Sequence, residues 1–141
     1  MTKHIFLDTK VVIDFLADRR PFSIDAAQLF DLAIEEKIRI YISAVSYNNI
    51  YYILRRSLTS NATIKLLDEL ADITEIADVT NEVIRNSLKT DFKDYEDAIQ
   101  YYCALNIPEI ELIVTRNTKD FKKSTIAVLT PAEAIISLHT T

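Results

Sequence analysis

The fold is decided by a stretch near the start of the chain, Ile5-Phe6-Leu7-Asp8-Thr9-Lys10-Val11-Val12-Ile13-Asp14-Phe15-Leu16. Its first three residues are apolar and predict a short buried strand. Asp8 and Thr9 then turn the chain into a helix with an apolar face. Parallel sheets bind ligands at the carboxyl ends of their strands, where the crevice opens, so Asp8 is a candidate site residue. The alternative is that its side chain only caps the following helix.

The rest of the chain repeats this alternation of strand and helix. Further strands are predicted at 38–42, 73–79, 112–114 and 126–129. Helices are predicted at 24–36, 45–58, 62–71, 81–88, 95–105 and 131–138, with the second and third of them forming a hairpin. Strands that alternate with helices form a parallel sheet covered on both faces, which predicts an α/β fold. The spacing leaves the strand order open.

The helix at 24–36 follows a break in the pattern. Ser23 is expected to cap this helix through its hydroxyl. The residues expected to face the core lie at helical spacing and are Ala27, Phe30, Ala33 and Ile34.

Composition limits the classes of function. The chain has 141 residues, the size of one domain spanning 1–141, and a hydrophobic fraction of 49% that can build a full core. It contains no glycine, which argues against the glycine-rich phosphate loops of P-loop and dinucleotide-binding proteins. The net charge of −5 disfavours strong non-specific nucleic-acid binding but leaves room for a local basic patch.

Cysteine usage and hydropathy indicate the compartment. The single Cys103 lies in an apolar helical pattern and is expected to pack in the core, so there is no disulfide framework. This fits a reducing cytoplasm, where we expect the protein to be located. No basic leader precedes a long apolar segment, so neither a signal peptide nor a membrane span is expected.

Acidic residues follow the predicted strands or begin a helix. Asp8 follows the first strand, and Asp120 follows the strand at 112–114. Asp94 and Asp97 are three residues apart at the start of the helix 95–105, so they share one helix face. Helix starts favour acids through the macrodipole, and that explanation suffices for Glu96, which we expect to be solvated. Asp97 instead borders an apolar face.

Carboxylates that meet in one crevice raise one another's pKa. A divalent cation relieves that repulsion, and hard oxygen ligands suit Mg²⁺ or Mn²⁺. Such a metal activates water and stabilises a phosphodiester leaving oxygen. Zinc is not expected, because His4 and His139 form no cluster with a cysteine.

The chain resembles the PIN-domain family, in particular VapC-like ribonuclease toxins. The resemblance lies in four segments in order, Ile5 to Phe15, Ile42-Ser43-Ala44-Val45-Ser46-Tyr47-Asn48-Asn49-Ile50, Asp94-Tyr95-Glu96-Asp97-Ala98-Ile99-Gln100, and Val114-Thr115-Arg116-Asn117-Thr118-Lys119-Asp120-Phe121. The family implies a three-layer α/β/α fold with a central parallel sheet of about four to five strands. It also implies an Mg²⁺- or Mn²⁺-dependent ribonuclease activity.

The resemblance implies roles for particular residues. The first family acid falls on Asp8 and the third on Asp97, with Asp94 beside it. The fourth falls on Asn117 or Asp120. The implied metal ligands are thus Asp8, Asp94, Asp97 and Asp120, and the implied catalytic residues are Asp8, Asp97 and Asp120.

The chain departs from the family at two positions. The second family acid, a glutamate, falls on Asn49, which offers a carbonyl oxygen but no charge. The asparagine two residues after the first acid is here Lys10, whose ammonium can pair with the acidic cluster. Both departures lower the expected metal affinity.

Three functional hypotheses remain. The first is a metal-dependent ribonuclease that cleaves single-stranded RNA, the toxin of a toxin–antitoxin pair, with Arg116 and Lys119 binding RNA phosphates. The second is a degenerate PIN module that binds a protein or RNA with weak or no cleavage, which Lys10 and Asn49 favour. The third is a small α/β domain whose acids only cap helices.

Tyrosines on the helix at 45–58 exceed what one buried face needs. Tyr47, Tyr51 and Tyr52 lie there together with Ile53. Tyrosine is enriched at protein interfaces, so these residues predict a homodimer or antitoxin surface. The alternative is that they divide between the core and scattered surface positions.

Overall fold

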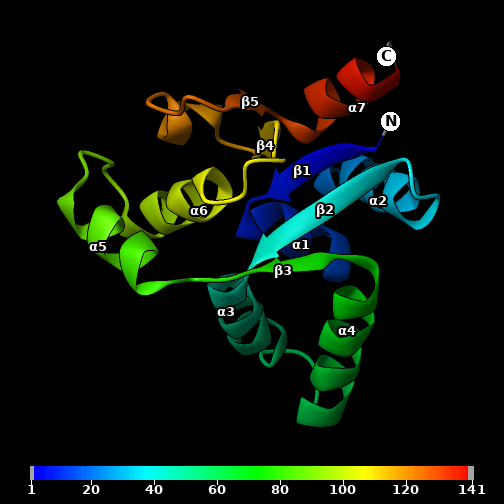
Figure 1. The fold of residues 1–141 in the computed structure, drawn as a ribbon. Helices are drawn as coiled ribbons and strands as arrows, with labels where there is room; N and C mark the ends of the chain where they lie inside the picture. Colours follow the sequence, from blue (N-terminus) through cyan, green and yellow to red (C-terminus); the bar gives the residue numbers. More distant parts are fainter. Residues whose placement is uncertain (1, 140–141) are drawn as a thin grey trace.

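Five parallel strands form the central sheet of the computed structural model, which describes residues 2–139. They are β1 (Lys3–Leu7), β2 (Ile38–Ser43), β3 (Glu75–Ala77), β4 (Leu112–Val114) and β5 (Ala127–Leu129). Their order is β3-β2-β1-β4-β5, with β1 at the centre (Figure 1). The chain builds outward from β1 to β3 and then returns to the other side of β1 for β4 and β5. This reversal places a crevice between the carboxyl ends of β1 and β4, where parallel sheets bind ligands.

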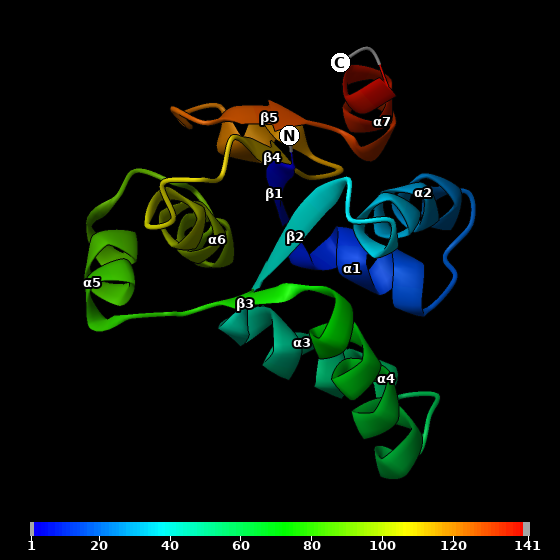
Figure 2. The ribbon, with the colours of Figure 1, turned by 45° about the vertical axis from the view of Figure 1, so that its right-hand side comes forward.

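Helices cover both faces of this sheet, as Figure 2 shows. The helices are α1 (Thr9–Leu16), α2 (Phe22–Ile34), α3 (Ala44–Leu54), α4 (Ser60–Ile73), α5 (Asn81–Lys89), α6 (Tyr95–Leu105), the short 3₁₀ helix η1 (Thr118–Phe121) and α7 (Pro131–His139). Helices α1, α2 and α7 pack on one face, and α5 and α6 pack on the other. The predicted three-layer α/β/α fold is confirmed.

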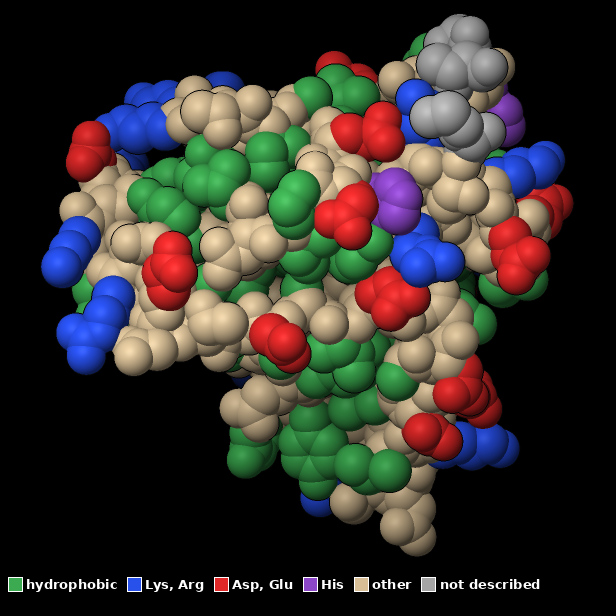
Figure 3. All heavy atoms as spheres, in the orientation of Figure 1, with side chains coloured by type: hydrophobic (Ala, Val, Ile, Leu, Met, Phe, Trp, Pro, Cys, Tyr) green, Lys and Arg blue, Asp and Glu red, His purple; other side chains and the backbone are tan. Residues whose placement is uncertain are grey.

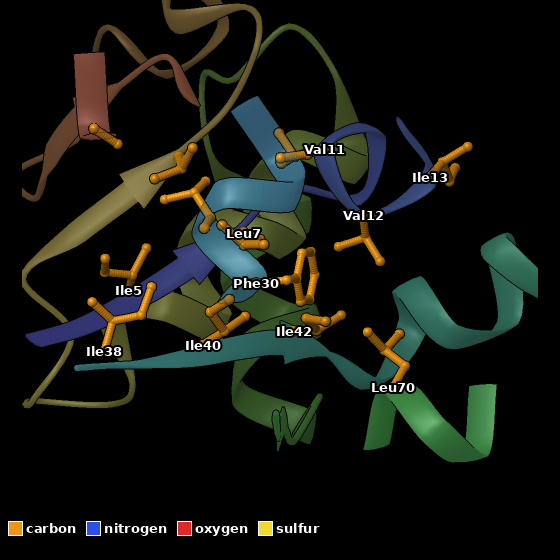
Figure 4. Close-up of a cluster of buried hydrophobic side chains, with 14 of the residues drawn as sticks. Ile5, Leu7, Val11, Val12, Ile13, Phe30, Ile38, Ile40, Ile42 and Leu70 are labelled. Atoms are coloured by element: carbon orange, nitrogen blue, oxygen red, sulfur yellow. The ribbon is translucent and has the colours of Figure 1, made fainter. Parts of the chain in front are cut away.

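Alternation along β1 explains how the sheet holds two cores. Ile5 and Leu7 point into a cluster that includes Phe30 of α2 and Leu70 of α4 (Figure 4). Phe6, between them, points to the opposite cluster beneath α6. Side chains of a strand alternate between faces, so a strand buried on both sides is apolar throughout. The run Ile5 to Leu7 is therefore the centre of both cores.

The start of α2 differs from the prediction. The helix begins at Phe22, two residues earlier than expected, and Pro21 occupies the cap position without a side-chain hydrogen bond. Ser23 is inside the helix and buried, and its hydroxyl donates to Oδ1 of Asp18 at 2.7 Å. The predicted Ser23 cap is wrong because proline, with its fixed φ, suits the helix start and moves the boundary upstream.

The inward face of α2 is also rotated from the predicted one. The buried residues are Ser23, Ala26, Leu29 and Phe30, whereas Ile34 is 60% exposed. Of the four predicted core residues only Phe30 is fully buried, because packing against the sheet and the neighbouring helices selects a different stripe of the same helix. Cys103 is buried, as predicted.

Two boundaries shift near the predicted helical hairpin. Helix α3 ends at Leu54 instead of residue 58, and α4 continues to Ile73, so β3 is shorter than predicted. The two helices do contact each other as a hairpin. None of the helices that the structure describes is long and apolar enough to cross a membrane.

Candidate functional site

A pocket of about 410 Å³ opens at the carboxyl ends of the central strands. It is lined by Asp8, Thr9, Lys10, Ile13, Asn49, Tyr52, Ile53, Asp94, Glu96, Asp97, Gln100, Asn117 and Asp120. A larger hollow of about 570 Å³ lies beside the amino-terminal ends of β2 and β3, near Arg39 and Glu75. None of the predicted site residues lines that hollow. The smaller pocket is therefore distinguished by its acidic residues and not by its volume.

Asp8 lies at the base of the pocket as the last residue before α1. Its Oδ1 accepts the backbone N–H of Thr9 at 2.8 Å, and its Oδ2 accepts the Thr115 hydroxyl at 2.8 Å. The side chain therefore caps α1 and also links the ends of β1 and β4, so the two roles considered for it coexist. Burial raises the pKa of Asp8, while the Thr115 and Thr9 hydrogen bonds oppose that rise.

Asp97 faces Asp8 from the first turn of α6. Its pKa is raised to about 7, first by burial and then by the charges of Asp8, Asp94 and Asp120. The same four carboxylates, from three separate segments, line one pocket. The predicted acids are thus brought together, although their roles stay predictions.

Asp94 and Asp120 occupy the exposed rim of the pocket. Asp94 is the N-cap of α6, and its Oδ1 accepts the backbone N–H of Asp97 at 3.1 Å. Asp120 lies in η1, which follows β4. One oxygen of Asp94 is therefore used in capping.

The two departures from the family also lie in the pocket. Lys10 is exposed at the rim, and its charge lowers the pKa of both Asp8 and Asp97, against the larger effect of burial. Nδ2 of Asn49 donates to Oε1 of Glu96 at 3.2 Å. Glu96 is exposed, as expected, and its place in the lining of the pocket was not predicted. Its partner is 47 residues away, so no local signal marks it.

Arg116 lies beside the pocket rather than in its lining. Its Nε lies 2.8 Å from Oδ2 of Asp14, an ion pair within the fold. The neighbouring Asn117 does line the pocket, and its backbone N–H donates to Oγ1 of Thr115 at 3.2 Å. Lys119 is exposed on η1. Contacts of Arg116 and Lys119 with RNA remain predictions.

A buried polar layer beneath the acids was not predicted. Nε2 of Gln100 donates to Oγ1 of Thr9 at 3.2 Å and to Oγ of Ser46 at 3.0 Å. The two hydroxyls are also 2.6 Å apart. Three helices, α1, α3 and α6, are therefore joined to one another next to the pocket. The only sequence signal was polar residues at otherwise apolar helix positions.

The donor set of the pocket consists of carboxylate and amide oxygens, which suit a hard divalent cation. Within residues 2–139, however, no three His, Cys, Asp or Glu side chains are already gathered closely enough to hold one ion. Of the exposed acids at the rim, Asp94 and Glu96 belong to the start of α6, and Asp120 lies on η1. The pKa of Asp97, raised to about 7, lets this carboxyl group take up or release a proton near neutral pH.

Comparisons with known proteins agree with this fold. A family profile described as the PIN domain matches residues 4–119. A chain of VapBC2 from Rickettsia felis, solved bound to a DNA fragment from the promoter, has a TM-score of 0.67 at 18% identity, covering 90% of this chain and 98% of its own. A toxin–antitoxin complex from Klebsiella pneumoniae has a TM-score of 0.66 at 24% identity, covering 90% and 97%.

A third structure is more distant. VapC20 from Mycobacterium tuberculosis, described as a toxin that cleaves the sarcin–ricin loop, has a TM-score of 0.59 at 15% identity, covering 77% of this chain and 86% of its own. No curated protein matches the chain. At these identities the structures establish the shared fold.

Proposed function

Because the chain belongs to the PIN-domain family, we propose that it is an Mg²⁺- or Mn²⁺-dependent ribonuclease that hydrolyses phosphodiester bonds in single-stranded RNA. The observation that carries the proposal is the meeting of Asp8, Asp97 and Asp120 in one pocket at the crevice between β1 and β4. Asp94 adds a fourth carboxylate at the rim. A cluster of this kind repels itself unless protons or a cation neutralise it.

The residues of the chain divide the work of the reaction. When bound, Mg²⁺ or Mn²⁺ would lower the pKa of water and offset charge on the phosphodiester. Asp8 is oriented by Thr9 and Thr115, so its oxygens present a fixed direction to a cation. Asp97, with its pKa raised to about 7, can accept the proton of the attacking water near neutral pH. Asp120, which lines the same pocket, would help to orient that water.

Cations near the pocket would hold the RNA backbone. Lys119 lies on η1 between the pocket residues Asn117 and Asp120, so its ammonium can reach a phosphate that enters over Asp120. Arg116 contributes less on this view, because its guanidinium already pairs with Asp14. The net negative charge makes such binding local rather than general.

The toxin role and the partner form part of the same proposal. The similar structures include toxin–antitoxin complexes, so an antitoxin is the proposed protein partner, alongside a second copy of this chain. Figure 3 shows hydrophobic side chains gathered where α3 and α4 lie. Tyr52 and Ile64 of these helices are 64% and 54% exposed. An interface there would cover apolar area that now faces solvent.

A degenerate PIN module that binds RNA or protein without cleavage is the second candidate. It is favoured by Lys10, which brings an ammonium to the pocket, and by Asn49, which brings no charge. An ammonium can neutralise carboxylates, but it cannot activate water as a divalent metal does.

Cleavage of a labelled single-stranded RNA distinguishes the two candidates. The full chain is incubated with Mn²⁺, with Mg²⁺ or with EDTA, and Asp97→Asn serves as the inactive variant. Asp68→Asn, an exposed acid on α4 away from the pocket, is the matched control. The nuclease proposal expects metal-dependent cleavage that Asp68→Asn retains and Asp97→Asn loses by about 100-fold or more. Equal cleavage by both variants would reveal a contaminant, and metal-independent binding without cleavage would favour the second candidate.

A further inference from the structure

Glu96 and Asn49 join two walls of the acidic pocket. The amide nitrogen of Asn49, on α3, donates to Oε1 of Glu96, on α6, at 3.2 Å. Both side chains line the pocket that contains Asp8 and Asp97. This hydrogen bond holds the carboxylate of Glu96 against α3. At that place α3 itself carries only the neutral amide of Asn49.

The chemistry of this partner matters. An amide donates a hydrogen bond but carries no charge, whereas a lysine or arginine would neutralise the carboxylate. Oε1 of Glu96 is oriented by the amide, and the side chain keeps its negative charge and a second oxygen. Carboxylates that bind metals are themselves commonly held by hydrogen bonds from a second layer of residues. Asn49 stands in that relation to Glu96.

A buried oxygen in the same pocket points independently to a bound species. Gln100 lines the pocket and is only 2% exposed, and its Oε1 has no hydrogen-bond partner among the residues that the structure describes. A buried acceptor without a partner costs free energy, so a group from outside the chain is expected to meet it. Carboxylates line the same pocket, so a hydrated divalent cation would supply both the positive charge and the hydrogen-bond donor that these residues lack.

We propose that Glu96, oriented by the side-chain amide of Asn49, is a ligand of the divalent cation in this pocket. The inference rests on the proposed function and adds one metal ligand to it, the Glu96 side chain of α6, which contacts Asn49. Location at a helix start does not by itself explain Glu96. Glu82 is likewise the second residue of its helix, α5, and gains the same macrodipole benefit outside the pocket. Glu82 is therefore the matched control for Glu96.

Calorimetric titration of the metal-free full chain with Mn²⁺ tests the proposal. Glu96→Gln removes one charge and keeps the shape, so affinity should fall by about tenfold or more. Glu82→Gln, with the same change of charge, should stay within about twofold of the wild type. The double variant Asn49→Glu/Glu96→Gln exchanges the amide and the carboxylate across their hydrogen bond, and it should recover most of the lost affinity. The Mn²⁺-dependent rise in melting temperature gives a second readout of binding, independent of nuclease activity.

The outcomes separate this inference from the proposed function. Wild-type binding with an unchanged Glu96→Gln variant would overturn the role of Glu96 and leave the nuclease proposal standing. If the double variant binds Mn²⁺ as weakly as Glu96→Gln, a carboxylate at position 49 cannot replace the one at position 96, which would overturn that part of the inference. No Mn²⁺ binding by the wild type would overturn both the metal-dependent function and the inference. An equal loss in Glu82→Gln would show a general charge effect and also overturn the role of Glu96.

Discussion

Arg116 and Asp14 form an ion pair that ties the segment after β4 to α1. Nε of Arg116 lies 2.8 Å from Oδ2 of Asp14, and Nη2 donates to Oδ1 at 3.3 Å. The Asp14 side chain is only 1% exposed, and the guanidinium carbon lies 4.0 Å from the ring centroid of Phe22. Arg116 is flanked by Thr115, which holds Asp8, and by Asn117 of the pocket. The pair therefore fixes one wall of the site.

Removal of Arg116 should destabilise the fold. Arg116→Ala leaves the buried Asp14 carboxylate unpaired, so we expect a loss of about 2–3 kcal/mol in the free energy of unfolding. Arg116→Lys keeps the charge but loses the planar guanidinium group, so its free energy of unfolding should lie between those of the wild type and Arg116→Ala. Urea unfolding measures the change, with the exposed Lys122→Ala as control, expected within about 0.5 kcal/mol of the wild type. An Arg116→Ala variant as stable as this control would mean that the pair contributes nothing.

Asp97 should make stability depend on pH. Its pKa is raised from 3.8 to about 7, so the folded chain keeps a proton that the unfolded chain releases in this interval. The resulting stabilisation is complete below about pH 4 and is lost as the pH rises through about 7. Asp97→Asn stays neutral, so it should match the wild type near pH 4 and exceed it by about 1 kcal/mol at pH 8, after allowance for solvent screening. Urea unfolding in EDTA tests this, and a constant difference across the range would contradict it.

The hydroxyl of Thr115 should matter more than its methyl group. Thr115→Val removes the hydrogen bond to Oδ2 of Asp8, and the cost should be about 1.5–3 kcal/mol because the acceptor is charged and buried. The pKa of Asp8, already raised by burial, should rise further. Thr115→Ser retains the hydroxyl and should lose less than half as much stability. Equal losses in the two variants would assign the effect to packing instead.

Local patterns in the sequence predicted the elements but not their arrangement. The apolar run at Ile5 to Leu7 specifies a strand buried on both faces, and the alternation of strand and helix specifies a parallel sheet. The order β3-β2-β1-β4-β5 depends on contacts between distant segments, and the spacing did not determine it. That order is what places Asp8 and Asp120 on either side of one crevice.

In the candidate site too, local patterns predicted some residues, whereas contacts between distant segments could not be predicted. The acids were recognisable because they follow strands or begin helices. The partners that orient them were not: Thr115 is 107 residues from Asp8, and Asn49 is 47 residues from Glu96. Neighbours on a helix such as Glu96 and Asp97 differ by about 100° in direction, and which of them faces a pocket depends on how the helix packs. Glu96 was missed for this reason.

Lys10 provides the test of how the site departs from its family. Its ammonium lies at the pocket rim, and its charge lowers the pKa of both Asp8 and Asp97. It therefore neutralises part of the negative charge that would otherwise attract a metal cation. Lys10→Asn should therefore strengthen Mn²⁺ binding by about tenfold, an effect of one nearby charge, and raise cleavage of single-stranded RNA. The Lys10→Asn/Asn49→Glu variant loses the amide contact to Glu96 but adds a charged oxygen ligand, which should outweigh that loss, so it should exceed the single variant in both measurements. The comparison is made with Asp97→Asn as the inactive reference and Lys65→Asn, an exposed lysine of α4, as the control. If Lys10→Asn and Lys65→Asn bind Mn²⁺ equally, Lys10 has no influence on the site.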